Sequence, residues 1–345
     1  MSEISKAIEA LIDDAVAAGG TNRDTDLIND MIHTVLDLNR NGADRGDLKL
    51  INTSLKEMRD AFAVFGNYRN ARKVCVFGSA RIGPDTPNYT LASDFASHMA
   101  RVRGWMVVTG AGPGLMEAAN LGAGQEHSLG VNIRLPFEDA ANPYIHPDRL
   151  VDFNYFFTRK LMFVKESDAF ALFPGGFGTQ DETFELLTLT QTGKSSIHPI
   201  VLIEAPGTGY WQPWRDFVET TLIDQGMISP RDLNLYTYTT DVETAADVIC
   251  RFYTNYHSQR FVGDLLILRL LRPLQPAHLE RLNDEFGDVL ASGRIESVGP
   301  ARPEVADDDN VGLPCIAFHF DRRSLGRLRS MVDLINELSP GESSP

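Results

Sequence analysis

The chain has 345 residues, 43% of them hydrophobic, which is enough to bury a large core in one or two globular domains and excludes intrinsic disorder. Its 47 Asp and Glu against 32 Lys and Arg give a formal net charge of −15, a field that repels nucleic acid. Long DNA or RNA is therefore not an expected partner, whereas a small phosphorylated ligand is allowed, because a few local N–H groups and cations can hold one phosphate.

The cysteine pattern and the composition of the N-terminal residues indicate in which cell compartment the protein is expected. Cys75, Cys250 and Cys315 lie far apart without a CxxC pair, which argues against a disulfide framework or a structural zinc site. The first twenty residues carry charges among their apolar positions and have no long uncharged stretch, so we expect neither a signal peptide nor a membrane segment. We therefore predict a cytoplasmic protein without a metal site or membrane contact.

Residues 1–70 have apolar side chains at helical spacing, which predicts three helices. The apolar positions that repeat in this way are Ile8, Leu11, Ile12 and Val16, then Leu27, Met31, Val35 and Leu38, then Leu55, Met58 and Phe62. We expect an N-terminal helical extension that covers the main domain or forms a dimer contact.

From Lys73 onward, short apolar runs alternate with stretches of helical spacing. The runs predicted as strands are KVCVFGSA, WMVVTG, LGVNIRLP, AFALFPGG and PIVLIE, and the helices predicted between them span 88–103, 113–126, 157–167 and 179–192. Strands that are apolar along their length and alternate with helices are typical of a parallel sheet covered on both faces. We predict a doubly wound, Rossmann-like α/β nucleotide-binding catalytic domain over residues 71–260.

The remaining elements complete that domain and add a small module. Helices are predicted near 211–225 and 241–257, on either side of YTYTT. Over residues 261–345 the pattern DLLILRLL, helix 276–290, GRIESV, LPCIAFHF and helix 324–338 predicts a β-α-β-β-α module. The acidic run Asp307, Asp308 and Asp309 falls between two of these strands, and we expect a solvated turn there, not a metal site.

Glycine-rich turns follow two of the early predicted strands, at the sheet edge where ligands bind in such folds. The first turn is Gly78-Ser79-Ala80-Arg81, and the second, TGAGPGLM, covers 109–116 and runs straight into a helix. Either a ligand or a tight strand-to-helix connection explains these glycines. The dinucleotide fingerprint GxGxxG fails because Leu115 stands where its third glycine should be, so a nicotinamide cofactor is not expected.

The segment FPGGFGTQDE, residues 173–182, follows an apolar strand and opens a helix. Its glycines and the helix N-terminus direct backbone N–H groups at one point, which suits a phosphate. The Walker pattern is excluded because no GK[ST] follows. Glu182 lies three residues beyond Thr179, a spacing that a capping box would also explain.

A pair of cations, Arg159 and Lys160, lies near the predicted start of the preceding helix. Cations there oppose the helix dipole at a cost of a few tenths of a kcal/mol or more. Ordinary surface charge is one explanation, and an anion bound between the two side chains is the other.

Together, PGGFGT with Glu182, the upstream Arg159-Lys160 pair and GAGPGLM resemble the LOG (Lonely Guy) phosphoribohydrolases over roughly residues 73–255. The chain exceeds the short members at both ends and is more similar to longer bacterial nucleotide nucleosidases. Members are often labelled lysine decarboxylases, but the sequence offers no recognisable pyridoxal-phosphate lysine. The resemblance implies hydrolysis of a nucleoside 5′-monophosphate, of the AMP or cytokinin riboside type, to free base and ribose 5-phosphate without a cofactor.

The resemblance also implies roles for individual residues. Arg159 and Glu182 are the expected catalytic pair, with the Glu182 carboxylate stabilising a ribosyl centre of oxocarbenium character and orienting or deprotonating water. The residues expected to bind phosphate or nucleotide are Ser79, Gly110, Gly112, Gly114, Met116, Lys160, Gly175, Gly176, Gly178 and Thr179.

Other inferences concern specificity, assembly and the alternative function. Phe156-Phe157-Thr158 replaces the Met-His-Glu-like sequence of short plant-type members, which leaves the preferred base open. The resemblance implies a homodimer or higher homo-oligomer. A non-catalytic nucleotide-binding or molybdenum-cofactor carrier of similar fold is the alternative, and retention of Arg159 and Glu182 favours the enzyme.

Overall fold

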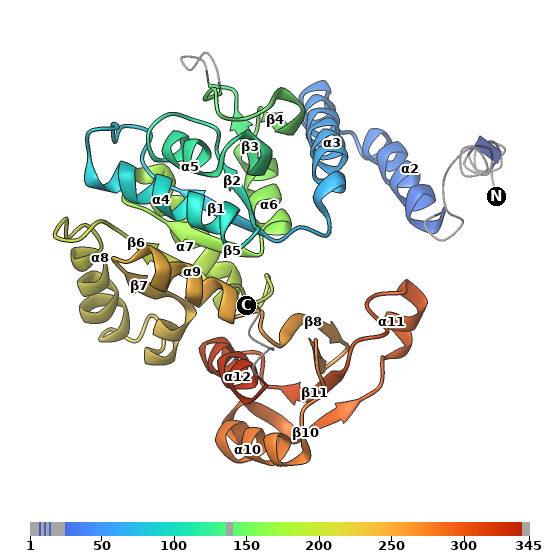
Figure 1. Ribbon diagram of the computed structural model, residues 1–345. Coiled ribbons are helices and arrows are strands. Elements are labelled where there is room, and N and C mark those ends of the chain that lie inside the picture. The colour runs from blue at the N-terminus through green and yellow to red at the C-terminus, as the bar shows by residue number, and fades with distance from the viewer. Residues whose placement is uncertain (1–6, 8–9, 12–13, 15–24, 136–140, 340–345) are drawn as a thin grey trace. The chain divides into compact units, whose positions relative to one another are not determined.

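The computed structural model describes residues 7, 10–11, 14, 25–135 and 141–339, and the chain divides into two compact units, Met1–Arg59 and Asp60–Pro345 (Figure 1). The first unit contains α2 (Thr25–Arg40) and most of α3 (Arg45–Phe65), which confirms the second and third predicted helices. The predicted first helix, with Ile8, Ile12 and Val16, lies outside the described residues, apart from a few positions such as Leu11.

Helix α2 keeps its apolar stripe exposed. Leu27, Met31 and Val35 recur at every fourth position and have 61%, 56% and 47% of their surface exposed. No residue of α2 is buried. Within the described ranges, no helix combines the length and the apolar composition that a membrane crossing needs.

In the part of the chain that the structure describes, seven parallel strands form one sheet in the order β4-β3-β2-β1-β5-β6-β7 (Figure 1). Their bounds are β1 (Lys73–Phe77), β2 (Met106–Thr109), β3 (Ser128–Ile133), β4 (Leu150–Phe153), β5 (Ala169–Leu172), β6 (Ile200–Ile203) and β7 (Thr237–Thr239). Every residue of β1, β2, β5 and β6 is buried, as expected for a doubly wound sheet. The predicted fold class is therefore confirmed.

Helices cover both faces of this sheet. Those involved are α4 (Pro87–Arg101), α5 (Leu115–Ala123), α6 (Phe156–Glu166), α7 (Phe177–Gln191), α8 (Trp211–Phe217) and α9 (Val242–Arg251). Val76 packs with buried side chains of α4, α5 and α9, whereas its neighbour Phe77 contacts Phe163 of α6, with ring centroids 4.8 Å apart. Successive strand residues point to opposite faces, so α6 covers the face that α4, α5 and α9 do not.

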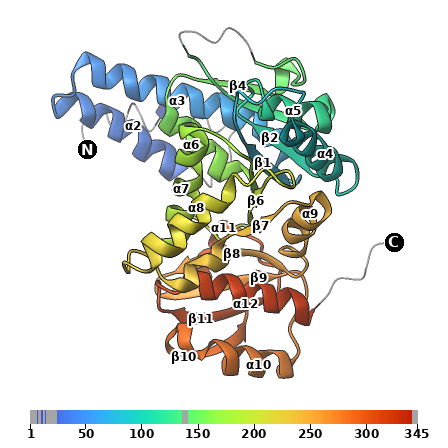
Figure 2. The same cartoon turned by 90° about the vertical axis from the view of Figure 1, so that its left-hand side faces the viewer.

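A separate antiparallel sheet, in the order β10-β11-β9-β8, occupies the described C-terminal residues. Its elements are β8 (Tyr256–Val262), β9 (Leu265–Leu270), α10 (Pro276–Phe286), β10 (Leu290–Val298), α11 (Arg302–Asp307), β11 (Cys315–Phe320) and α12 (Leu325–Leu338). Helix α12 lies across the strands (Figure 2), and its buried residues share a core with α10, β9 and β11. The prediction of a helix over 241–257 was too long, because α9 ends at Arg251 and β8 begins five residues later.

The acidic run in this module is part of an ion-pair network. Arg260 pairs with Asp307 at 2.5 Å and with Asp309 at 3.0 Å. The guanidinium of Arg269, which is almost fully buried, pairs with Asp309 at 2.6 Å and with the buried Glu304 at 2.7 Å. Asp307, the last residue of α11, and Asp308, in the turn that follows it, are both exposed, as expected for a solvated turn, and the arginines add ion pairs to Asp307 and Asp309.

Candidate active site

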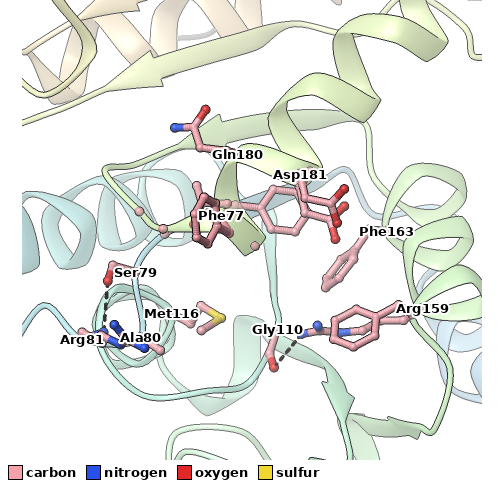
Figure 3. A pocket seen from close by; sticks show the side chains of 18 residues that line it. Phe77, Ser79, Ala80, Arg81, Gly110, Met116, Arg159, Phe163, Gln180 and Asp181 are labelled. Atoms are coloured by element: carbon pink, nitrogen blue, oxygen red, sulfur yellow. Dashed lines mark hydrogen bonds between the residues drawn. The ribbon is translucent and has the colours of Figure 1, made fainter. Parts of the chain in front are cut away.

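A cavity of about 670 Å³ opens at the carboxyl ends of the central strands. The chain proceeds outward from β1 through β2, β3 and β4, then returns to β5 on the other side of β1. The loops after β1 and β5 therefore separate and leave a crevice, the place where doubly wound sheets bind ligands. The predicted residues that line it are Ser79, Gly110, Met116, Arg159, Gly175, Gly176, Gly178, Thr179 and Glu182 (Figure 3).

Gly112 and Gly114 do not line this cavity and have packing roles instead. A Cβ on Gly112 would lie 2.8 Å from Cε of Met116. Gly114 has a φ of +71°, and a Cβ there would overlap the backbone carbonyl of Ser79, which accepts a hydrogen bond from the Leu115 N–H at 3.0 Å. Gly114 thus allows close contact between the loop after β1 and the start of α5, and Gly112 leaves room for the Met116 side chain.

Lys160 also lies outside the cavity lining, and its partners are carboxylates of α7. Its Nζ is 2.7 Å from Asp181 Oδ2 and 2.6 Å from Glu185 Oε2. Burial lowers the pKa of Lys160, but these two hydrogen-bonded carboxylates outweigh it and raise the pKa. The anion expected beside this cation is therefore supplied by the protein. No group of three or more His, Cys, Asp or Glu side chains in the described part could hold a metal ion.

The start of α7 supplies the anion-binding geometry. Gly176 is the N-cap residue and has no side-chain cap, and the Gln180 N–H donates to its carbonyl at 3.0 Å. The N–H groups of Phe177, Gly178 and Thr179 are consequently without a carbonyl in their own helix, at its positive end. A Cβ on Gly176 or Gly178 would meet nothing within 4 Å, so both backbones face open space in the cavity.

Two residues that the sequence did not single out, Tyr210 and Glu204, support the backbone of the glycine loop before α7. A Cβ on Gly175 would overlap the side chain of Thr179, so this glycine is required for packing. The Tyr210 hydroxyl donates to the Gly175 carbonyl at 2.5 Å and accepts from Gln180 Nε2 at 2.6 Å. The fully buried Glu204 accepts from the Tyr210 N–H at 2.5 Å. Tyr210 and Glu204 are thus positioning residues for the loop.

Arg159 reaches the cavity from the first turn of α6 and is fixed by two backbone carbonyls, one within β3 and one directly after β2. Its Nε donates to the Val131 carbonyl at 2.8 Å. Its Nη2 donates to the Gly110 carbonyl at 3.2 Å (Figure 3). A Cβ on Gly110 would overlap Nη2 of Arg159. The glycine after β2 is therefore required because the guanidinium passes over it, a reason that the sequence did not reveal.

Glu182 lies in the second turn of α7 and is 7% exposed. The helix begins at Phe177, two residues earlier than predicted, so the Thr179–Glu182 spacing is not a capping box. No hydrogen bond or ion pair joins the Glu182 carboxyl to another described residue. Burial raises the pKa of this carboxyl to about 7, although the Lys160 and Arg159 cations act to lower it.

Substituting Glu182 should stabilise the fold. Because the folded-state pKa of about 7 exceeds the usual 4.5, the folded protein holds a proton that the unfolded chain has released between these pH values. The free energy of unfolding therefore falls as pH rises through this window. Glu182→Gln removes that loss and should raise stability at pH 8 by about 3 kcal/mol, with the gain vanishing toward pH 4.5. Thermal unfolding at both pH values measures this, and a gain independent of pH would contradict it.

Aromatic and charged residues that the sequence did not single out complete the cavity. They include Phe77, Arg81, Phe156, Phe163, Phe177, Gln180 and Asp181. Phe156 is 53% exposed and Phe177 is 96% exposed. A hydrophobic ring in the middle of a glycine loop was the available signal for Phe177, since such a ring has no core to enter there.

Comparisons with known proteins agree with the motif pattern. Residues 114–249 match a family model described as "possible lysine decarboxylase". A cytokinin riboside 5′-monophosphate phosphoribohydrolase of Arabidopsis thaliana is 28% identical over 165 residues, 46% of this chain and 72% of that protein. A probable cytokinin riboside 5′-monophosphate phosphoribohydrolase of Oryza sativa subsp. japonica is 30% identical, over 46% of this chain and 74% of that protein.

Among solved structures, the molybdenum cofactor carrier protein from Chlamydomonas reinhardtii is 18% identical. The match covers 52% of this chain and 97% of that one, with a TM-score of 0.37. A similarity at this level carries no argument about function.

Proposed function

Because the chain belongs to the LOG family, whose matched relatives are named as phosphoribohydrolases, we propose that it hydrolyses the N-glycosidic bond of a nucleoside 5′-monophosphate. The products are the free base and ribose 5-phosphate, and AMP or a cytokinin riboside 5′-monophosphate is the type of substrate. One observation carries the proposal: Glu182, a buried carboxylate with no hydrogen-bond or ion-pair partner among the described residues, lines the same cavity as an uncapped helix N-terminus.

The 5′-phosphate occupies the start of α7 in this proposal. The N–H groups at Phe177, Gly178 and Thr179 donate to its oxygens, and the helix dipole favours its charge. Glu182 projects from the next turn of the same helix, so a ribose anchored by its phosphate at the N-terminus lies within one helical turn, about 5 Å along the axis, of the carboxylate. Anchoring the phosphate thus orients the reacting carbon.

Glu182 then performs the chemistry. As the C1′–N bond breaks, positive charge develops on the ribose ring, and the buried carboxylate of Glu182 stabilises it. The same carboxylate accepts a proton from the attacking water, whose oxygen bonds to C1′ while the bonding electron pair leaves with the base. A pKa near 7 suits a group that must be ionised yet basic.

Arg159 acts on the leaving base or on the ribose hydroxyls. Its guanidinium, fixed on the carbonyls of Val131 and Gly110, is a cation held at the cavity wall. There it donates to the leaving base or to the ribose hydroxyls, where charge builds in the transition state. The exposed rings of Phe156 and Phe177 offer faces on which a base stacks.

Gly178→Ala tests the phosphate grip. The new Cβ enters the cavity beside N–H groups that bind phosphate, so KM should rise by about 10-fold or more, whereas the melting temperature should hold or increase because alanine favours a helix over glycine. Gly287→Ala in the C-terminal module is the matched control, since a Cβ there also meets nothing within 4 Å. Equal KM values for the two variants would contradict this placement of the phosphate.

A substrate panel tests the activity itself. Each nucleoside 5′-monophosphate should yield base and ribose 5-phosphate at some rate, and the matching nucleosides without phosphate should react far more slowly because they lose the α7 anchor. A carrier protein would instead retain intact ligand without releasing base. The decarboxylase label has little support in the site, because no described residue lining the cavity is a lysine that could bind pyridoxal phosphate.

A further inference from the structure

A polar cavity of about 570 Å³ lies at the opposite edge of the parallel sheet from the candidate active site. Its walls come from the segment before β1, from Asp168 just before β5, from the segment before β6, and from β8 of the antiparallel sheet. The amino ends of the central strands therefore form one wall, and the C-terminal module forms another. None of its lining residues belongs to the candidate active site.

The cavity carries one cation without a carboxylate partner among the described residues, Arg69. Arg69 lines it, is exposed, and has no hydrogen bond or ion pair among the described residues. Arg72 lines it too, 2.6 Å from Asp168 Oδ1. Burial lowers the pKa of His257, and the Arg72 and Arg269 cations lower it further, in spite of the Asp168 and Asp309 carboxylates. An anion with several hydrogen-bond acceptors suits such a place.

The remaining lining residues indicate which other chemical groups an anionic ligand of this cavity has. Asn70, Ser196, Ser258 and Asn310 present amides and hydroxyls, which match the hydroxyl groups of a sugar. The aromatic surface is already used, because the Arg72 guanidinium covers the Tyr253 ring at 3.9 Å and Tyr256 is 1% exposed. Neither tyrosine therefore offers a free ring face on which a nucleobase could stack.

We propose that this cavity binds a sugar phosphate, with the phosphate on Arg69 and the hydroxyls on the surrounding amide and hydroxyl side chains. The site is separate from the catalytic one and does not depend on the proposed reaction. It is nevertheless connected to the active site by β5, because Asp168 directly precedes this strand and the glycine loop directly follows it. A bound sugar phosphate also bridges the catalytic sheet and β8.

Calorimetric titration of the full chain tests the proposal, with ribose 5-phosphate and glucose 6-phosphate as separate probes. All titrations use the Gly178→Ala background, in which the phosphate grip at α7 is weakened, so that binding at the catalytic cavity does not obscure the result. At least one probe should bind with one site per chain, and adding Arg69→Glu should weaken that binding by 10-fold or more. Arg101→Glu, an exposed arginine at the end of α4, is the control and should leave it unchanged.

Three results would overturn the proposal: binding of neither probe, binding that Arg69→Glu does not change, or binding of AMP that is tighter than that of both sugar phosphates and is weakened by Arg69→Glu. Arg69 has no partner in the described structure, so the unfolding temperature of its variant should match that of the parent and exclude misfolding as a cause. The titrations measure binding alone. If the proposed hydrolysis were wrong, the titrations could still be interpreted, and if no sugar phosphate bound, the proposed hydrolysis would be unaffected.

Discussion

Glu182→Gln should lower kcat by about 10³-fold while the dissociation constant for nucleotide changes little. The amide keeps the shape of the side chain but cannot accept the proton from water or stabilise positive charge on the ribose. The N–H groups at the start of α7 remain, so the phosphate still binds. Single-turnover release of base, together with equilibrium binding of the monophosphate, measures the two quantities separately.

Glu185→Gln is the control for that experiment. Glu185 lies on the same helix, but its carboxylate pairs with Lys160 and does not line the cavity. Its substitution should change kcat by less than about 10-fold. Comparable losses in the two variants would mean that general disturbance of α7, and not the chemistry of Glu182, accounts for the effect.

The activity should also report the ionisation of Glu182. The carboxylate must be ionised to act, and its pKa is about 7, so kcat/KM should fall about tenfold for each pH unit below that value and level off above it. At pH 5 the loss is about 100-fold. A pH profile of kcat/KM for the full chain with one nucleoside monophosphate measures this.

Lys160→Met separates this ionisation from that of the substrate phosphate. The Lys160 cation acts to lower the pKa of Glu182, so its removal should move the acid limb of the profile to higher pH. Lys160→Arg keeps the charge and should leave the limb in place. A limb that stays fixed in both variants would assign it to the substrate and would contradict a role for Glu182 as base.

The sequence predicted the parallel sheet well and its edge elements poorly. Strands such as β1 and β5 are apolar along their length because both faces are buried, and that signal is local. Strand β4 has only four residues, one of them the exposed Asp152, so it lacks this continuous apolar signal. Strand β8 is only partly buried; its first two residues were predicted as the end of a helix, and the others were assigned to no element. The dipeptide Gly263-Asp264, which forms a tight hairpin turn with Gly263 at a φ of +61°, could have revealed this strand.

In the candidate site, too, contacts within one segment could be predicted from the sequence, whereas contacts between distant segments could not. The glycine loop and Glu182 are consecutive in the chain, so their proximity could be predicted from one segment. The support that Tyr210 gives to Gly175 spans 35 residues, and only the fold brings the two together. Lys160 was expected to bind the ligand, but its side chain pairs with Asp181 and Glu185. The sequence does not reveal that α7, which carries these carboxylates, packs against α6.

The most direct test of the central claim follows the oxygen atom of the attacking water. Hydrolysis of a nucleoside 5′-monophosphate in ¹⁸O-labelled water, quenched before the free sugar exchanges its C1 oxygen with solvent, should place one label in ribose 5-phosphate and none in the base. Inorganic phosphate should not appear. Label in released phosphate would identify a phosphatase, and bound nucleotide with no product would identify a carrier; either result would contradict the assignment of this site to N-glycosidic bond cleavage.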